Sequence, residues 1–331
     1  SSAASDLYKR QEYTVTIEPG ATKTLDVVNY EPSGQITLTK RDSETGTAQG
    51  SATLQGAVYQ LSASTNIVRA NGEIVYTAGQ VIGNAATDAN GQIVWNGLYP
   101  GGSYAIKEIQ PSDGYNLDTS TYIVELNFKD SSTAVVTASR VSYEKVIRSD
   151  IELSKFGTDS VDTENTKKIP LKGVIFSIQS LTTNQKWYMV TNENGYIDSV
   201  TDKIYSKVNT TNGTVKVDAS SVVTRNSRGM FPRDKYLITE LNTPAGYMPI
   251  QPMTVVLDKQ SYKYQWILED KDIISALRVE KTDAETGQVI PIANTSFHLY
   301  DAQGKQIKMV ASRYPTTQYI DCLLYTSPSP R

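Results

Sequence analysis

The chain has 331 residues, a formal net charge of −3 and a hydrophobic fraction of 39%. This length is enough for two or three domains, and the nearly balanced charge gives no sign of a nucleic-acid or membrane partner. One cysteine, Cys322, excludes an internal disulfide, and one histidine, His298, excludes multi-histidine metal sites and most Ser-His-Asp arrangements. We therefore expect no cofactor, no metal site and no turnover enzyme within these residues.

The composition favours strands over helices. Tyrosine is abundant, with 21 residues, and Thr, Val and Ile recur in short alternating runs that Gly, Asn, Asp and Pro separate. The sequence shows no long helical period, and it has no run of about 18 apolar residues that could span a bilayer. The predicted fold class is all-β.

The first element that raises a chemical question is the run ITLTKRD at 36–42. Read as a strand, it places Ile36, Leu38 and Lys40 on one face. An ammonium group on an apolar face is costly unless it is paired, neutralised or able to reach water. A single lysine of this kind usually lays its stem on apolar surface and extends its charge to solvent, and that interpretation stays open.

The same motif returns twice along the chain. It reads IELSKFG from residue 151 and LRVEKTD from residue 277, so that Lys155 and Lys281 take the position of Lys40. The separations of 115 and 126 residues are each the length of one domain. This repeat predicts four parts: the last strands of an upstream module at 1–33, whole modules at 34–148 and 149–274, and the start of a further module at 275–331.

The last ten residues, CLLYTSPSPR, continue no strand pattern. They are typical of vector or adaptor sequence, so we expect a non-native tail here, and the native sequence beyond about residue 320 stays open.

A glutamate recurs late in each whole module. The motif YAIKEIQPSDGY starts at residue 104, and YLITELNTPAGY starts at residue 236. On a strand, Glu108 shares a face with Tyr104 and Ile106, and Glu240 stands in the same relation to its own motif. Each module is therefore predicted to aim a carboxyl group into the layer that receives its lysine.

A third element precedes each lysine by eleven residues. These positions hold Asn29, Glu144 and Asp270, each close to the end of the module before. Asn29 and Asp270 share a strand face with apolar residues, whereas Glu144 shares its face with Ser142 and not with the apolar residues beside it. Glu144 is therefore a poor candidate for the role that the other two could take.

A lysine, a glutamate and an Asn or Asp side chain in one dry interior are the parts of an intramolecular amide bond. Burial lowers the pKa of a lysine towards the neutral nucleophile and raises the pKa of a glutamate, which can then hold and pass a proton. Fixed proximity can supply effective molarities of roughly 10⁵ M or more. Such a bond needs no cofactor and forms once in each module.

These motifs resemble the Cna B-type, or SpaA-type pilin, domains of Gram-positive surface proteins. The lysine strand, the Y-x-[IL]-x-E box followed by P-x-x-G-Y, and the closing V-x-N or L-x-D strand carry the resemblance, which covers the chain except its last residues. It implies tandem prealbumin-like (Cna B-type) β-sandwich modules, secretion, and cell-wall anchoring through a sorting signal missing from this sequence. It also implies a pilus shaft or adhesin stalk braced by Lys–Asn or Lys–Asp bonds.

For the second whole module, the resemblance makes Lys155 the nucleophile, Asp270 the acceptor and Glu240 the proton-transfer acid. All three stand at the matching positions of their motifs.

For the other modules the resemblance is less complete. Lys40 and Glu108 match in the first whole module, but the acceptor is uncertain because Glu144 departs from the family pattern. Asn29 would be the acceptor for the upstream module, and Lys281 would be a nucleophile whose partners lie outside this sequence.

Two other functions stay open. The polar segment 200–230 is long enough to be an insertion, and long loops on a rigid scaffold often carry binding. The chain could therefore provide adhesin modules that contact a host matrix protein or glycan, or accessory modules of a secreted enzyme. For a stalk, the expected partners are the neighbouring modules of the same chain; the ligand and the choice between pilus subunit and anchored adhesin stay open.

Overall fold

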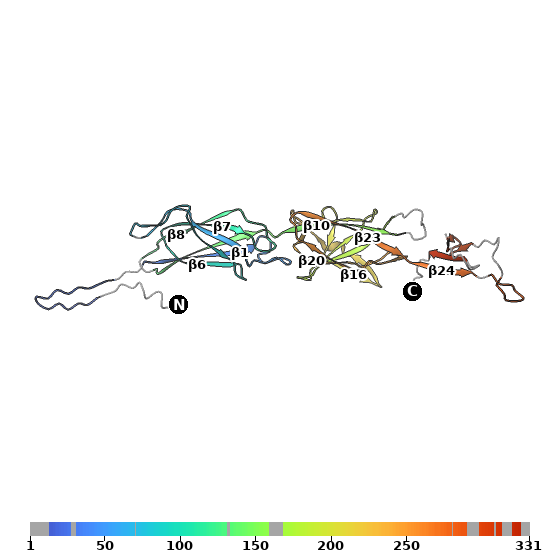
Figure 1. The fold of residues 1–331 in the computed structure, drawn as a ribbon, viewed down its shortest axis with the longest axis horizontal. Helices are drawn as coiled ribbons and strands as arrows, with labels where there is room; N and C mark the ends of the chain where they lie inside the picture. Colours follow the sequence, from blue (N-terminus) through green and yellow to red (C-terminus); the bar gives the residue numbers. More distant parts are fainter. Residues whose placement is uncertain are drawn as a thin grey trace. The chain divides into compact units, whose positions relative to one another are not determined.

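The computed structural model describes residues 13–27, 31–69, 71–130, 133–158, 168–279, 281–289, 298–307, 309–312 and 320–325. The chain divides into two compact units, residues 1–147 and 148–331 (Figure 1). This division keeps residues 1–33 and 275–331 within the units beside them, so the module boundaries predicted at those places stay predictions.

The first unit is a sandwich of two sheets, ordered β6-β1-β9 and β5-β2-β7-β8, with a small β3-β4 pair. Its strands are β1 (Ser33–Asp42), β2 (Val58–Ala63), β3 (Ile67–Val68), β4 (Ile74–Tyr76), β5 (Val81–Ala86), β6 (Gln92–Leu98), β7 (Gly102–Gln110), β8 (Thr121–Leu126) and β9 (Val135–Glu144).

The second unit repeats this plan with more strands. One sheet has the order β11-β10-β23-β21, with β14 and β19 also paired to β10, and the other has the order β18-β15-β13-β12-β20-β22. Its elements as far as residue 272 are β10 (Arg148–Gly157), β11 (Ile169–Pro170), β12 (Ile175–Ser180), β13 (Lys186–Val190), β14 (Tyr196–Asp198), β15 (Ile204–Tyr205), β16 (Val208–Thr211), β17 (Thr214–Val217), the short 3₁₀ helix η1 (Ala219–Ser221), β18 (Val222–Val223), β19 (Phe231–Pro232), β20 (Asp234–Glu240), β21 (Tyr247–Met248), β22 (Met253–Leu257) and β23 (Tyr262–Asp272).

The described residues beyond 272 form two smaller sheets, β24-β28-β27 and β25-β26. The strands are β24 (Ile274–Val279), β25 (Leu299–Tyr300), β26 (Gln306–Ile307), β27 (Met309–Ser312) and β28 (Ile320–Tyr325). Within the described ranges, η1 is the single helical element, and the all-β prediction is confirmed.

Strand alternation decides which side chains enter each core. Along β1, Ile36 and Leu38 are fully buried, and along β10, Ile151 and Leu153 are fully buried. Each fully buried side chain of this size contributes roughly 1.5–3 kcal/mol. The lysine two residues further along each strand points the same way, so Lys40 and Lys155 are carried into the core with no solvent exposure.

In each sandwich, the first strand lies beside the last and runs parallel to it. β1 pairs with β9, and β10 pairs with β23. A parallel pair needs a long crossover connection, and here the connection is the rest of the sandwich. Side chains far apart in the sequence therefore share one sheet face at the centre of the module.

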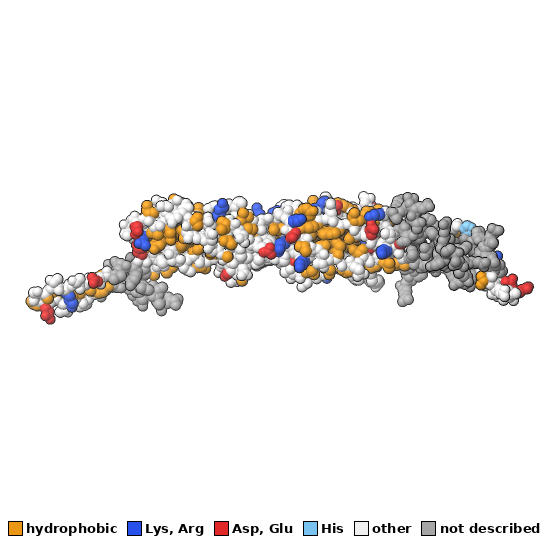
Figure 2. Space-filling model, viewed as in Figure 1, with side chains coloured by type: hydrophobic (Ala, Val, Ile, Leu, Met, Phe, Trp, Pro, Cys, Tyr) orange, Lys and Arg blue, Asp and Glu red, His pale blue; other side chains and the backbone are white. Residues whose placement is uncertain are grey.

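The surface and the composition of the described residues give few further indications of function. On the face shown in Figure 2, Lys and Arg side chains are scattered among Asp and Glu rather than gathered into one large patch. In the described part of the chain, no helix is both long and apolar enough to cross a membrane. The same residues contain no cluster of three or more His, Cys, Asp or Glu side chains suited to a metal ion.

Candidate functional site

The second module gathers its three predicted residues into one buried cluster. Lys155 comes from β10, Glu240 from the end of β20 and Asp270 from β23, and none of the three side chains is exposed. The Lys155 Nζ atom lies 2.9 Å from Glu240 Oε2 and is also in contact with Asp270 Oδ1. The amine thus touches both carboxyl groups in a dry interior.

The strand register places Asp270 beside the Lys155 amine. Lys155 lies opposite Leu268 on the parallel strand, and Asp270, two residues further on, lies opposite Gly157. A Cβ atom at Gly157 would come within 2.2 Å of the Tyr247 ring, so the aromatic ring closes the site over the glycine. Leu268 belongs to the hydrophobic core of the module, and Tyr247 packs against that core.

Burial shifts the protonation of Asp270. Desolvation raises the pKa of Asp270 to about 6, with the nearby Glu240 charge adding to the rise and Lys155 opposing it. Glu240 Oε1 and Asp270 Oδ2 have no hydrogen-bond partner among the described residues. Unpaired buried oxygens are unfavourable, and protonation of a carboxyl group in the cluster would lower this cost.

The first module builds a cluster of the same kind around Lys40. Its Nζ atom lies 2.9 Å from Glu108 Oε1 and 3.5 Å from Glu144 Oε2, and all three side chains are buried. The second oxygen of Glu108, Oε2, accepts a hydrogen bond of 2.6 Å from the backbone N–H of Asp118. Burial raises the pKa of Glu108, although the Asp118 N–H and Lys40 oppose the rise.

The sequence-based view of Glu144 rested on a wrong assignment of the inner face. Val141 and Tyr143 are 36% and 59% exposed, whereas Ser142 and Glu144 are 0% and 1% exposed. Alternation along β9 holds, but the polar side chains point inward. The physical reason is that the core beside Lys40 is itself polar, so hydrophobicity alone picks the wrong face of this strand.

Two further residues of the first site were missed from the sequence. The Tyr59 hydroxyl, on β2, lies 3.0 Å from Glu144 Oε1, and the Ser142 hydroxyl also hydrogen-bonds to Oε1. Aligning the two modules could have identified these residues. Tyr59 and Ser142 stand at the positions of Phe176 and Leu268, which have no hydroxyl groups.

Two predicted residues are left, Asn29 and Lys281. Asn29 lies outside the described residues. Lys281 is exposed and follows β24, which ends at Val279. Their predicted roles as acceptor and nucleophile therefore stay predictions.

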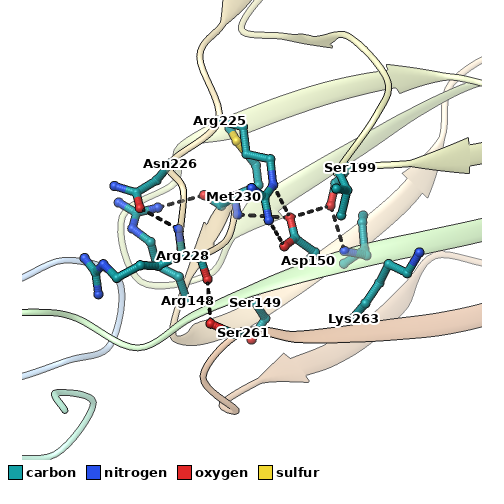
Figure 3. A network of polar contacts seen from close by, with 12 residues as sticks. Arg148, Ser149, Asp150, Ser199, Arg225, Asn226, Arg228, Met230, Ser261 and Lys263 are labelled. Atoms are coloured by element: carbon teal, nitrogen blue, oxygen red, sulfur yellow. Dashed lines mark hydrogen bonds and ion pairs between the residues drawn. The ribbon is translucent and has the colours of Figure 1, made fainter.

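The polar segment 200–230 is held against β10 by a separate network (Figure 3). Arg225 donates two hydrogen bonds to the Asp150 carboxylate, which also accepts from the Ser199 hydroxyl and the Met230 backbone N–H. Burial by itself would raise the pKa of Asp150, but the hydrogen bonds from Arg225 and Ser199 outweigh it and hold the pKa below its usual value. The segment is thus tied to the scaffold at its C-terminal end.

Comparison with known proteins supports the fold. Residues 34–141 match the family described as SpaA, prealbumin-like fold domain. No curated protein matches the chain.

Three solved structures are similar to the chain. The TIE protein of Bacillus anthracis aligns with 21% identity and a TM-score of 0.50 over 84% of this chain, which spans 41% of that protein. The minor pilin GBS52 of Streptococcus agalactiae has 21% identity and a TM-score of 0.24, covering 72% of this chain and 96% of its own. The shaft pilin SpaA of Lactobacillus rhamnosus GG has 18% identity and a TM-score of 0.25, covering 73% and 98%. Of these three, the first shows a shared fold.

Proposed function

Since residues 34–141 form a SpaA-type prealbumin-like domain, we propose that the chain supplies structural stalk or shaft modules of a Gram-positive cell-wall-anchored surface protein. In this proposal, the second module is braced by an isopeptide bond between Lys155 and Asp270. The observation that carries it is the buried cluster in which the Lys155 amine contacts both Glu240 and Asp270.

The cluster has the parts for a balanced condensation. Glu240 takes a proton from the Lys155 ammonium, and the neutral Nζ attacks Cγ of the protonated Asp270. One C–O bond of Asp270 breaks, and Glu240 gives the proton to the leaving hydroxyl group, so that one water departs. Glu240 then takes the second proton from Nζ and ends protonated. The product is a neutral amide beside a protonated Glu240, so the buried charges of Lys155 and Glu240 are both removed.

The bond would change how the module bears force. It joins β10 to β23, the first and last strands of the sandwich, which are parallel neighbours. A pull applied at the two ends would pass through the covalent link and would not peel strands from the sheets. This behaviour suits an extracellular stalk whose partners are the neighbouring modules of the same chain.

Contact with a host matrix protein or glycan stays a prediction. The 200–230 segment carries the β16-β17 hairpin, whose residues are largely exposed. Binding by chains with and without this hairpin shortened is the measurement that would test it.

Mass spectrometry tests the brace directly. The full chain should contain, after proteolysis, a peptide in which Lys155 and Asp270 are joined with the loss of one water. Lys155→Met should abolish that peptide, whereas Lys168→Met, which changes an exposed lysine, should retain it. Recovery of Lys155 and Asp270 on separate, unmodified peptides from the native chain would overturn the proposal.

A further inference from the structure

At two positions near the acceptor, the first cluster carries a hydroxyl group and the second carries none. Tyr59 lies opposite Glu108 across the sheet, as Phe176 lies opposite Glu240. The two aromatic residues therefore occupy the same position beside the buried lysine, and the difference between them is one hydroxyl group.

A second hydroxyl group appears on the strand that brings the acceptor. Ser142 pairs with Lys40 in the first module, and Leu268 pairs with Lys155 in the second. A serine in a buried strand position needs a hydrogen-bond partner, and here that partner is the adjacent carboxylate.

The acceptor position itself differs by one methylene group. Glu144 lies opposite Asp42 in the register of β1 and β9, as Asp270 lies opposite Gly157 in that of β10 and β23. The Asp42 carboxylate is occupied by its own turn and by Tyr115, so it does not compete for Lys40. The longer acceptor side chain and the two added hydroxyl groups occur together at one site.

We propose that Lys40 and Glu144 form a second isopeptide bond, a Lys–Glu link. The hydroxyl groups of Tyr59 and Ser142 act as positioning donors that fix the acceptor oxygen Oε1. This inference rests on the proposed function, because it extends the same self-condensation to the first module.

The contacts assign a role to each atom of the acceptor. Glu144 Oε1 accepts hydrogen bonds from both hydroxyl groups, whereas Oε2 has no hydrogen-bond partner among the described residues and faces Lys40 Nζ at 3.5 Å. When Nζ attacks Cδ, negative charge develops on Oε1, where the two donors already point. The oxygen that leaves is Oε2, which no donor holds.

Proton transfer balances through Glu108. Its Oε1 lies 2.9 Å from Lys40 Nζ and takes the ammonium proton. Nζ then forms a bond to Cδ of the protonated Glu144, the bond from Cδ to Oε2 breaks, and Glu108 delivers the proton to the departing hydroxyl group. Glu108 then takes the second proton from Nζ and ends protonated. One water leaves, and the hydroxyl groups of Tyr59 and Ser142 remain bonded to the amide oxygen.

Tyr59 is suited to remain a donor throughout. Burial, with the charge of Glu144 next in importance, raises the pKa of Tyr59, so the phenol keeps its proton. The Tyr59 hydroxyl is within hydrogen-bond distance of both Ser142 Oγ and Glu144 Oε1, and that of Ser142 is within reach of both Tyr122 and Glu144 Oε1. We assign both protons to Oε1, the acceptor that carries charge.

The first experiment is a peptide map of the full native chain. The proposal expects a branched peptide that contains Lys40 and Glu144 and is one water lighter than its two parts. Lys40 and Glu144 recovered on separate unmodified peptides would overturn it. The Lys155 and Asp270 peptides in the same digest report on the second module, so the failure of either bond is seen independently.

The second experiment changes the leaving group. Glu144→Gln should lose ammonia in place of water and reach the same final mass as the cross-linked native chain, because both form the same amide. Glu144→Ala should retain the full mass at this site. A Glu144→Gln chain that keeps its ammonia would contradict the assignment of this residue as acceptor.

The third experiment separates positioning from structure. Tyr59→Phe combined with Ser142→Ala should slow cross-linking during refolding by about 100-fold, the loss typical when oxyanion donors are removed. Phe176 shows that phenylalanine fits this position, and Phe176→Tyr serves as the matched change in the second module. An unchanged rate in a chain that folds with native circular dichroism would refute the role of the two hydroxyl groups.

Discussion

Tyr59 of the first module occupies the position that Phe176 holds in the second. Each lies across the sheet from the buried glutamate of its own module, Glu108 or Glu240. The two sandwiches therefore share a backbone plan but surround their lysines with different chemistry. In an experiment on the whole chain, each module can therefore serve as a control for changes made in the other.

Removing the second nucleophile should destabilise its module strongly. Lys155→Met removes the proposed cross-link, which would close a loop of more than 100 residues and for which the chain-entropy model gives roughly 4–5 kcal/mol. It also leaves two buried carboxyl groups without their amine. We expect the guanidinium midpoint of this module to fall, and Lys168→Met, an exposed change, to shift the free energy of unfolding by less than about 0.5 kcal/mol.

The rate of bond formation should fall as the pH rises above the pKa of Asp270. The neutral acid is the electrophile, and its pKa is raised to about 6, so each pH unit above that value leaves roughly tenfold less of the reactive form. Chains refolded from denaturant before the bond forms should cross-link faster at pH 5 than at pH 8. Asp270→Asn, which has no carboxyl group to titrate, should lack this dependence on the acceptor.

The same raised pKa fixes the sign of a stability effect in the unreacted chain. The folded state holds the Asp270 proton more tightly than the unfolded state does, so the contribution is fully present below the unfolded pKa and is lost as pH rises through about 6. Formation of the amide should abolish this dependence. Unfolding curves from pH 4 to pH 7 before and after cross-linking provide the measurement.

Asp150→Asn should loosen the insertion that Arg225 anchors. The pKa of Asp150 is lowered in the folded state, so its contribution is present above the unfolded pKa and is lost as pH falls through the folded pKa. We expect a loss of about 1–3 kcal/mol at neutral pH and faster hydrogen exchange at the Met230 amide. Glu193→Gln, which changes an exposed ion pair with Lys172, is the control and should leave that exchange rate unchanged.

Gly157→Ala should disturb the acceptor strand pair. The added Cβ would meet the Tyr247 ring at 2.2 Å, which forces the ring away from its place over the site. A cost of roughly 1–3 kcal/mol is expected, together with incomplete cross-linking at Asp270. Gly83→Ala adds a Cβ into open space and should change stability by less than about 1 kcal/mol. Equal denaturation midpoints for the two variants would contradict the packing role of Gly157.

The sequence by itself determined the all-β class and both lysine–glutamate pairs. Strand alternation carries these features: once Ile36 and Leu38 face the core, Lys40 must follow them, and the same rule places Glu108. Repetition of the motifs strengthened the prediction that these lysines are buried. One copy would not have been enough, because a lone lysine at a strand end usually extends its charged end to solvent.

Only the tertiary structure decided which carboxyl group meets each lysine. The register between the first and last strands is a long-range property, and it places Glu144 beside Lys40 although its strand is more polar on its inner face than on its outer one. Local hydrophobicity cannot signal a buried polar face, since the partners that make it favourable come from other strands. The roles of Tyr59 and Ser142 also depend on the tertiary structure, because only the folded chain brings Glu144 Oε1 within hydrogen-bond distance of both hydroxyl groups.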